Sequence, residues 1–246
     1  MPYISIELCA FNIQSCLVAE KVGVARIELC DNPVEGGTTP SFGLIHKARS
    51  SVSMELYPII RPRAGNFLYD EEELNIIKQD ILLCKELACD GVSVGVQKQN
   101  GEIDIDRMKQ VVEWAYPMGV TCHRVFDRTP DPFKALEDVI ESGCERILTS
   151  GQKTTAVEAI DVLAKLVQQA GDRISIMPGA GVRSNNIERL VNETGAKEFH
   201  TSAKMIIPNT VTFQNPAMND TGEMILAGEE ELGLMLTKVR SISPQN

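Results

Sequence analysis

Short runs of apolar and β-branched residues alternate along the chain with longer segments in which apolar residues recur every three or four positions. The short runs predict eight strands, at 3–10, 24–30, 54–60, 91–96, 119–123, 145–149, 173–177 and 197–201. The amphipathic segments predict eight helices, at 13–22, 42–51, 70–88, 104–115, 131–142, 155–170, 185–194 and 229–241. Strands and helices therefore alternate from one end of the chain to the other.

Polar residues mark several helix starts. Capping boxes are expected at Asp70 with Glu73 and at Thr155 with Glu158, because each pair can satisfy free amides of a first turn. A side chain at 184–185 is expected to cap the seventh helix. Glycines are favoured just after a helix, where the backbone turns left-handed. The glycines expected in such positions are Gly23, Gly119, Gly143 and Gly195.

The spacing of the strands predicts their arrangement. Successive strand ends lie roughly 21 to 34 residues apart, which leaves room for one crossover helix and therefore favours parallel strands. Eight such units in 246 residues predict an α/β fold, a single (β/α)₈ TIM barrel that occupies residues 1–246 as one domain. A doubly wound open sheet is the alternative. A long loop at 207–228, after strand eight, is expected to be a lid, a binding loop or a disordered segment.

Composition narrows the class of protein. Lys and Arg number 24 and Asp and Glu 34, giving a net charge of −10 that disfavours nucleic acid as a partner. Apolar runs are too short to span a membrane, and the N-terminus does not resemble a signal peptide, so a cytoplasmic protein is expected. The seven cysteines include no CxxC pair, which is typical of free thiols in a reducing compartment.

Candidate chemistry gathers where the predicted strands end, which is where barrel enzymes carry their active sites. Strand alternation points Glu7, Glu28, Arg61 and His123 into the barrel or its mouth, and Asp127 is expected to orient His123 or its neighbour Arg124. These five side chains form a hypothetical catalytic set of acids, bases and a cation. An ion network that only closes the barrel is the alternative.

A glycine-rich loop at 179–183 runs into the seventh helix, and barrels often bind phosphate at this place. A tight turn with no ligand is the alternative. His200 faces either the barrel or the core, and both alternatives remain open. The residues predicted to bind an anion are Arg63, Ser150, Gly179, Gly181 and Ser202.

Cys9 and Cys30 end two neighbouring predicted strands, so their thiols are expected to come close. Two thiolates suit a soft ion such as Cu(I). The alternative is that both are small buried apolar side chains. Lys153 and Lys204 lie in loops past strands, so a lysine aldolase is not favoured.

Several segments identify a family. The chain resembles the copper homeostasis protein CutC family, and the resemblance touches seven of the eight predicted strands. It implies a cytosolic (β/α)₈ barrel that acts in copper homeostasis and binds Cu(I) through cysteines, which here would be Cys9 and Cys30 of the two ELC motifs. The matching segments are IELCA at 6–10, RIELCDNPVEGGTTPS at 26–41, PIIRPRAGNFLY at 58–69, TCHRVFD at 121–127, ILTSGQK at 147–153, MPGAGVR at 177–183 and FHTSAK at 199–204.

Three hypotheses about function follow. The first is a CutC-like copper homeostasis protein with Cu(I) as its ligand. The second is a TIM-barrel lyase, isomerase or hydrolase that acts on a small anionic or phosphorylated metabolite, and the third is a scaffold without catalytic activity. Neither nucleic acid nor membrane is expected as a partner, and the large outer helices are compatible with a homodimer.

Overall fold

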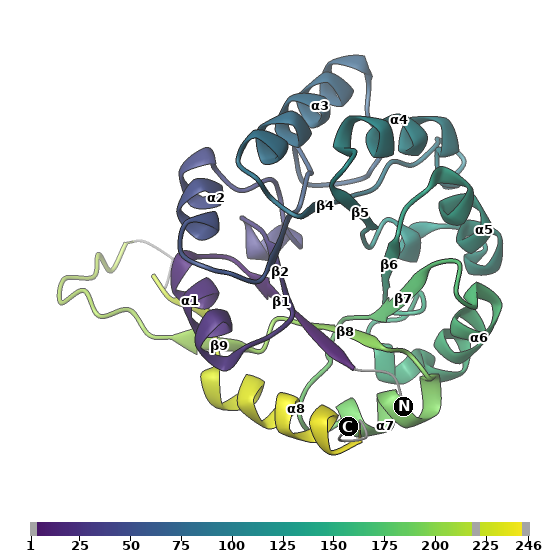
Figure 1. The fold of residues 1–246 in the computed structure, drawn as a ribbon. Helices are drawn as coiled ribbons and strands as arrows, with labels where there is room; N and C mark the ends of the chain where they lie inside the picture. Colours follow the sequence, from purple (N-terminus) through teal and green to yellow (C-terminus); the bar gives the residue numbers. More distant parts are fainter. Residues whose placement is uncertain (1–3, 218–221, 243–246) are drawn as a thin grey trace.

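The computed structural model describes residues 4–217 and 222–242, and in them eight strands form a ring surrounded by eight helices (Figure 1). The (β/α)₈ barrel predicted from the sequence is confirmed. The barrel strands are β1 (Ser5–Ala10), β2 (Arg26–Leu29), β3 (Glu55–Pro58), β4 (Gly91–Val94), β5 (Gly119–Cys122), β6 (Arg146–Thr149), β7 (Ser175–Pro178) and β8 (Glu198–Thr201). The helices are α1 (Ile13–Val22), α2 (Phe42–Arg49), α3 (Glu71–Glu86), α4 (Ile105–Ala115), α5 (Pro132–Ser142), α6 (Ile160–Ala170), α7 (Ile187–Thr194) and α8 (Glu229–Ile242).

The strands pair in parallel within two four-stranded sheets, whose orders are β3-β2-β1-β8 and β4-β5-β6-β7. A parallel bridge between Ile59 and Ser93 joins β3 to β4, and β7 lies beside β8 on the other side of the ring (Figure 1). The two sheets thus close into one ring, although among the described residues no hydrogen-bonded ladder joins β7 to β8. No helix in the described part of the chain has both the length and the apolar character needed to cross a membrane.

The apolar core lies mainly between the strands and the helices. Alternate strand residues, such as Leu8 and Leu29, pack there against the helices. Their neighbours Glu7 and Glu28 are also buried, but they belong to the polar interior of the barrel. The alternation of side chains along parallel strands therefore places a set of charged groups inside the ring.

Most helix boundaries agree with the capping signals, and three differ. Gly119 does not end a helix in the left-handed conformation, because α4 ends at Ala115 and Gly119 is the first residue of β5. Asp70 and Glu73 form the expected capping box. Thr155 makes no capping bond to the backbone, because its hydroxyl donates to Glu158 and a short 3₁₀ helix, η3 (Ala156–Ala159), precedes α6. Ser184 does not cap α7, since its amide and hydroxyl both donate to Glu231 of α8. Two further 3₁₀ turns are η1 (Pro33–Glu35) and η2 (Phe126–Arg128).

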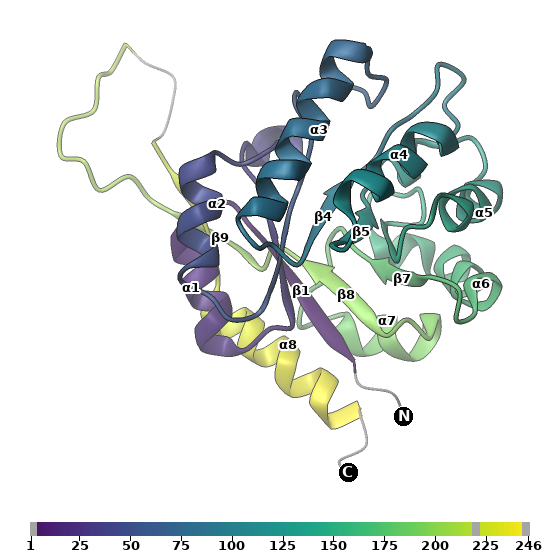
Figure 2. The same ribbon diagram turned by 45° about the horizontal axis from the view of Figure 1, so that its top comes forward.

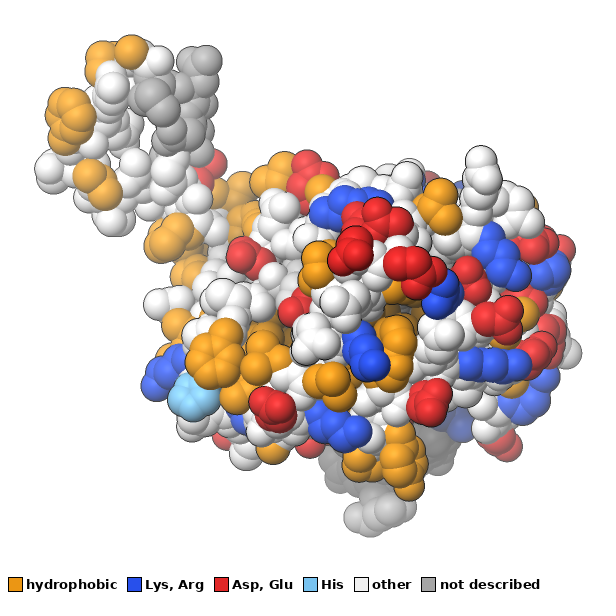
Figure 3. All heavy atoms as spheres, turned by 90° about the horizontal axis from the view of Figure 1, so that it is seen from above, with side chains coloured by type: hydrophobic (Ala, Val, Ile, Leu, Met, Phe, Trp, Pro, Cys, Tyr) orange, Lys and Arg blue, Asp and Glu red, His pale blue; other side chains and the backbone are white. Residues whose placement is uncertain are grey.

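The stretch predicted as a loop at 207–228 is in part strand, and its residues 218–221 lie outside the described residues. Strands β9 (Lys204–Ile207) and β10 (Met224–Ala227) pair antiparallel and form the base of a long hairpin that projects beside α1 and α2 (Figure 2). The base is anchored to α1, because the Asn12 amide donates to the Ile225 carbonyl at 2.7 Å. Apolar side chains lie exposed along this hairpin (Figure 3). They are Met205, Ile206, Val211, Phe213 and Met224.

Candidate functional site

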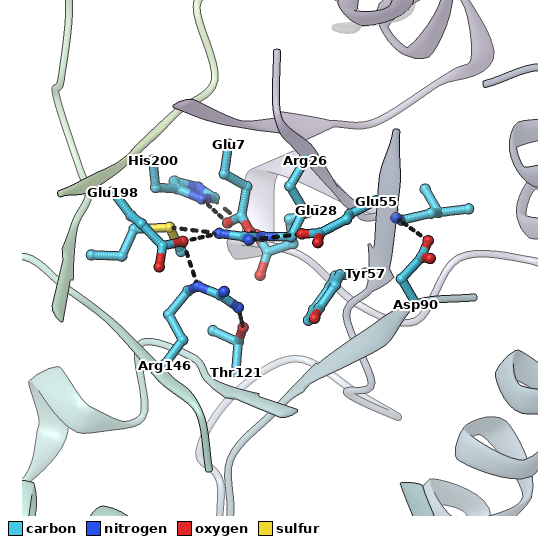
Figure 4. A network of polar contacts seen from close by, with 12 residues as sticks. Glu7, Arg26, Glu28, Glu55, Tyr57, Asp90, Thr121, Arg146, Glu198 and His200 are labelled. Carbon is cyan, nitrogen blue, oxygen red and sulfur yellow. Dashed lines mark hydrogen bonds and ion pairs between the residues drawn. The ribbon is translucent and has the colours of Figure 1, made fainter. Parts of the chain in front are cut away.

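A layer of ion pairs crosses the inside of the barrel (Figure 4). Arg26 of β2 bonds at once to Glu7 of β1 and Glu198 of β8, and Arg146 of β6 donates to Glu198 at 2.7 Å. Each of the two arginines is nine-tenths buried, so its neighbouring carboxylates supply the compensation that a buried charge requires. Arg26, Arg146 and Glu198 were not among the site residues predicted from the sequence. Strand alternation indicates two of them, because Arg26 lies two residues before Glu28 and Glu198 lies two residues before His200.

Toward the mouth of the barrel, His200 connects this layer to Glu28. Its Nδ1 lies 2.7 Å from Glu7 Oε1, and its Nε2 lies 3.8 Å from Glu28 Oε2. Burial opposes a charged imidazole, but the hydrogen bonds to Cys9 and Glu7 and the two carboxylates raise the pKa of His200 well above its usual value. His200 therefore carries a positive charge at neutral pH. Of the two alternatives for His200, the barrel and the core, the side chain faces the barrel.

The pKa values of the Glu7 and Glu28 carboxyl groups are shifted in opposite directions. Burial raises the pKa of Glu7, but the hydrogen bond from His200 and the charge of Arg26 outweigh burial and lower it to about 2. Burial raises the pKa of Glu28 above its usual value, and the charge of Glu7 adds to this. One Glu28 oxygen, Oε1, is buried and has no hydrogen-bond partner among the described residues. The site thus pairs a carboxyl group whose pKa is lowered with one whose pKa is raised.

The thiols of Cys9 and Cys30 meet at the end of β1 and just past β2. Their sulfur atoms lie 3.7 Å apart, and Cys30 Sγ lies 3.6 Å from Glu28 Oε2. The strand register pairs Cys9 with Glu28 rather than with Cys30, which reflects the stagger of strands in a barrel. Cys9, Glu28 and Cys30 each offer one ligand atom within 4.8 Å of the others, an arrangement that could hold a metal ion.

The surroundings of the two thiols shift their pKa values in opposite directions. The hydrogen bond from Cys30 lowers the pKa of Cys9, and His200 lowers it further. Burial raises the pKa of Cys30 well above its usual value. Cys9 is half-buried and Cys30 is fully buried. Cys9 is therefore the thiol that ionises first and the one that lines the cavity at the mouth.

A cavity of about 180 Å³ opens at the mouth of the barrel. It brings together six of the predicted site residues, each from a different strand or the loop after it: Cys9, Glu28, Arg61, His123, Gly181 and Ser202. A larger hollow, about 370 Å³, lies toward the amino ends of β7 and β8, and no cysteine or histidine lines it. The remaining residues around the mouth cavity are Phe11, Gly36, Ile59, Phe67, Arg124, Leu148, Ala180, His200 and Thr201.

Arg61 and His123 both lie against the Phe67 ring in the wall of this cavity. The guanidinium carbon of Arg61 is 5.0 Å from the centre of the Phe67 ring, and the His123 ring centre is 4.8 Å from it. Burial and the charge of Arg61 lower the pKa of His123 to about 3. His123 is therefore neutral at physiological pH, unlike His200.

Other predicted residues have roles outside the cavity. Asp127 accepts hydrogen bonds from Ser150 and from Arg124, so it holds the loop after β6 and orients Arg124 as expected. Arg63 turns away and pairs with Glu73 at the start of α3. Gly179 is required by packing, because a Cβ there would lie 2.5 Å from Leu148 Cδ1. Asp127, Ser150, Arg63 and Gly179 do not line the mouth cavity.

These observations define a class: a (β/α)₈ barrel with a paired-thiol, metal-competent site at its mouth. The CutC family model matches residues 4–205, and the chain belongs to the CutC family. A CutC family protein of Parabacteroides distasonis is 50% identical over 227 residues, which cover 92% of this chain and 93% of that protein. One from Chromobacterium violaceum is 44% identical over 209 residues, 85% of each chain.

A solved structure agrees with this assignment. The crystal structure of a CutC protein from Streptococcus agalactiae, described as a candidate copper homeostasis protein, is 35% identical. It superimposes with a TM-score of 0.77 and covers 81% of this chain and 98% of its own. Membership of this family relates the chain to copper homeostasis by homology.

Proposed function

We propose that this protein binds Cu(I) through the thiolates of Cys9 and Cys30 and thereby acts in copper homeostasis. The observation that carries the proposal is the pair of thiols facing each other at 3.7 Å beside an open cavity. Thiolate sulfur is a soft ligand that selects Cu(I) over harder ions, so the chemistry of the donor pair fits the metal. The family relationship supports the same function.

The positions of the two thiols would let a metal ion enter from the mouth cavity and then be enclosed by protein. Cys9 lines the cavity, so an ion can reach it from the barrel mouth, whereas Cys30 lies behind it and is fully buried. Glu28 lies against Cys30, and its proximity gives the site a third donor of a harder kind. The charge of His200, held by Glu7, offsets the negative charge that two thiolates bring into the barrel.

An anaerobic titration with Cu(I) against a competing chelator tests the proposal. Wild-type protein should bind one Cu(I) per chain, and a Cys9→Ser, Cys30→Ser variant should lose this binding. Serine replaces sulfur by oxygen at similar size, so the variant removes the soft ligand with little change in packing. Circular dichroism of both proteins checks that they fold alike.

The chain offers a matched control. Cys84 and Cys89 form a second buried pair of thiols at the end of α3, outside the mouth cavity. A Cys84→Ala, Cys89→Ala variant should bind Cu(I) as the wild type does. Equal Cu(I) affinity in the Cys9/Cys30 variant and the wild type, or loss of binding only in the Cys84/Cys89 variant, would contradict the proposal.

A further inference from the structure

The cavity at the mouth contains a buried cation without a protein counter-ion. Arg61 is only 5% exposed, and among the described residues no carboxylate lies within 4.0 Å of its guanidinium nitrogens. Its terminal nitrogens donate three hydrogen bonds, all to backbone carbonyls, of Glu35, Gly37 and Gly65. A guanidinium has five N–H groups, so two remain. One of them is on Nε, which has no hydrogen-bond partner among the described residues, although the buried Tyr69 hydroxyl also interacts with Arg61.

His123 adds a second available donor in the same wall. Its Nδ1 accepts a hydrogen bond from the Val125 amide at 3.1 Å, so the proton of the neutral ring resides on Nε2. Nε2 is buried and has no partner within the described residues. Buried donors without partners are rare in native proteins, and a bound ligand is one reason for them.

Apolar surface lies beside these polar groups. Phe67 lies against both Arg61 and His123, and Ile59 and Leu148 also line the cavity. At another side of the cavity, the unpartnered oxygen of Glu28 can accept a hydrogen bond. An anion with a carbon body and a hydroxyl group matches this set better than an inorganic ion.

We propose that the cavity binds a small hydroxy-carboxylate, with its carboxylate against Arg61 and His123 and its carbon body against Phe67. The hydroxyl of the ligand donates to Glu28. A carboxylate is favoured over a phosphate ester because Glu28 shares the cavity and a dianion would be repelled by it. Gly179, which a phosphate loop would require, is instead packed against Leu148. The site shares Glu28 with the proposed copper site, but its two donors to the carboxylate, Arg61 and His123, are not among the candidate metal ligands.

Ligand-observed NMR with lactate as the probe tests this site, with lactamide and inorganic phosphate as comparison compounds. Lactate should bind saturably, and lactamide, which lacks the charge, should bind at least roughly tenfold more weakly, as expected for loss of a charge-assisted hydrogen bond. Phosphate binding as strong as that of lactate, or equal binding of lactate and lactamide, would overturn the assignment, as would no saturable binding of lactate.

Two variants and two controls localise the binding. His123→Asn keeps an acceptor for the Val125 amide but removes the Nε2 donor, so lactate affinity should fall roughly tenfold. Arg61→Lys keeps the charge but loses the planar fork and should also weaken binding. Arg63→Gln, whose arginine pairs with Glu73 outside the cavity, should bind lactate normally. So should the Cys84→Ala, Cys89→Ala variant, whose thiols lie outside the mouth cavity. Unchanged lactate binding in both His123→Asn and Arg61→Lys would refute the proposal.

Discussion

Replacing His123 by asparagine should reduce the sensitivity of the fold to acid. His123 is 2% exposed, and burial together with the charge of Arg61 lowers its pKa from 6.5 to about 3. The folded protein therefore holds this ring neutral, while the unfolded chain takes up a proton below pH 6.5. Stability from a neutral buried histidine is present above pH 6.5 and is lost as the pH falls toward 3.

The magnitude follows from the two pKa values. One pKa unit corresponds to about 1.4 kcal/mol, so the His123 contribution to the free energy of unfolding should fall by about 2 kcal/mol between pH 7 and pH 5. Asparagine does not titrate, and its side-chain oxygen can accept the hydrogen bond from the Val125 amide that His123 Nδ1 accepts. The other titrating groups, including Glu7 and His200, are present in both proteins and cancel in the comparison.

Urea unfolding of wild type and His123→Asn at pH 7 and pH 5, under reducing conditions, measures this difference. The wild type should lose about 2 kcal/mol more than the variant over this interval. An exposed histidine on α2 supplies the control, since His46→Asn should follow the wild type. Parallel pH dependence in the wild type and in His123→Asn would refute the reasoning.

Further variants test the barrel interior and its packing. Arg26→Met should lower the free energy of unfolding by about 3–5 kcal/mol, because it leaves Glu7 and Glu198 buried beside fewer cations. Arg173→Met, which removes an exposed ion pair, should have little effect, and urea unfolding compares the two variants. Gly91→Ala should cost about 1–3 kcal/mol, because its Cβ would lie 2.1 Å from the Tyr57 ring, and an unchanged melting temperature would contradict this. Gly233→Ala in α8, where a Cβ meets nothing within 4 Å, should instead stabilise the protein by about 0.5–1 kcal/mol.

The fold could be predicted because its signals are local and repeated. Each strand and helix has its own periodicity, and eight units of one kind admit few arrangements. Strand parity also placed Glu7, Cys9 and Glu28 correctly inside the barrel, because alternation is a property of the strand itself.

The parts that could not be predicted depend on contacts between distant segments. Arg61 and Arg63 both follow β3, yet only Arg61 enters the cavity, because backbone carbonyls around 35–37 hold it there while Glu73 draws Arg63 outward. The sequence leaves open whether Asp127 orients His123 or Arg124, and the contact with Arg124 depends on how the loop after β5 folds. The pairing of β9 with β10 joins segments separated by a long polar stretch, so no short-range pattern indicated it.

The central claim is that Cys9 and Cys30 together hold Cu(I). X-ray absorption at the copper edge of the Cu(I)-loaded protein tests it most directly, because the spectrum reports which elements surround the metal. Two sulfur neighbours in the wild type, lost in the Cys9→Ser, Cys30→Ser variant, are the predicted result. A spectrum with only nitrogen or oxygen neighbours, or one that the two substitutions leave unchanged, would contradict the account.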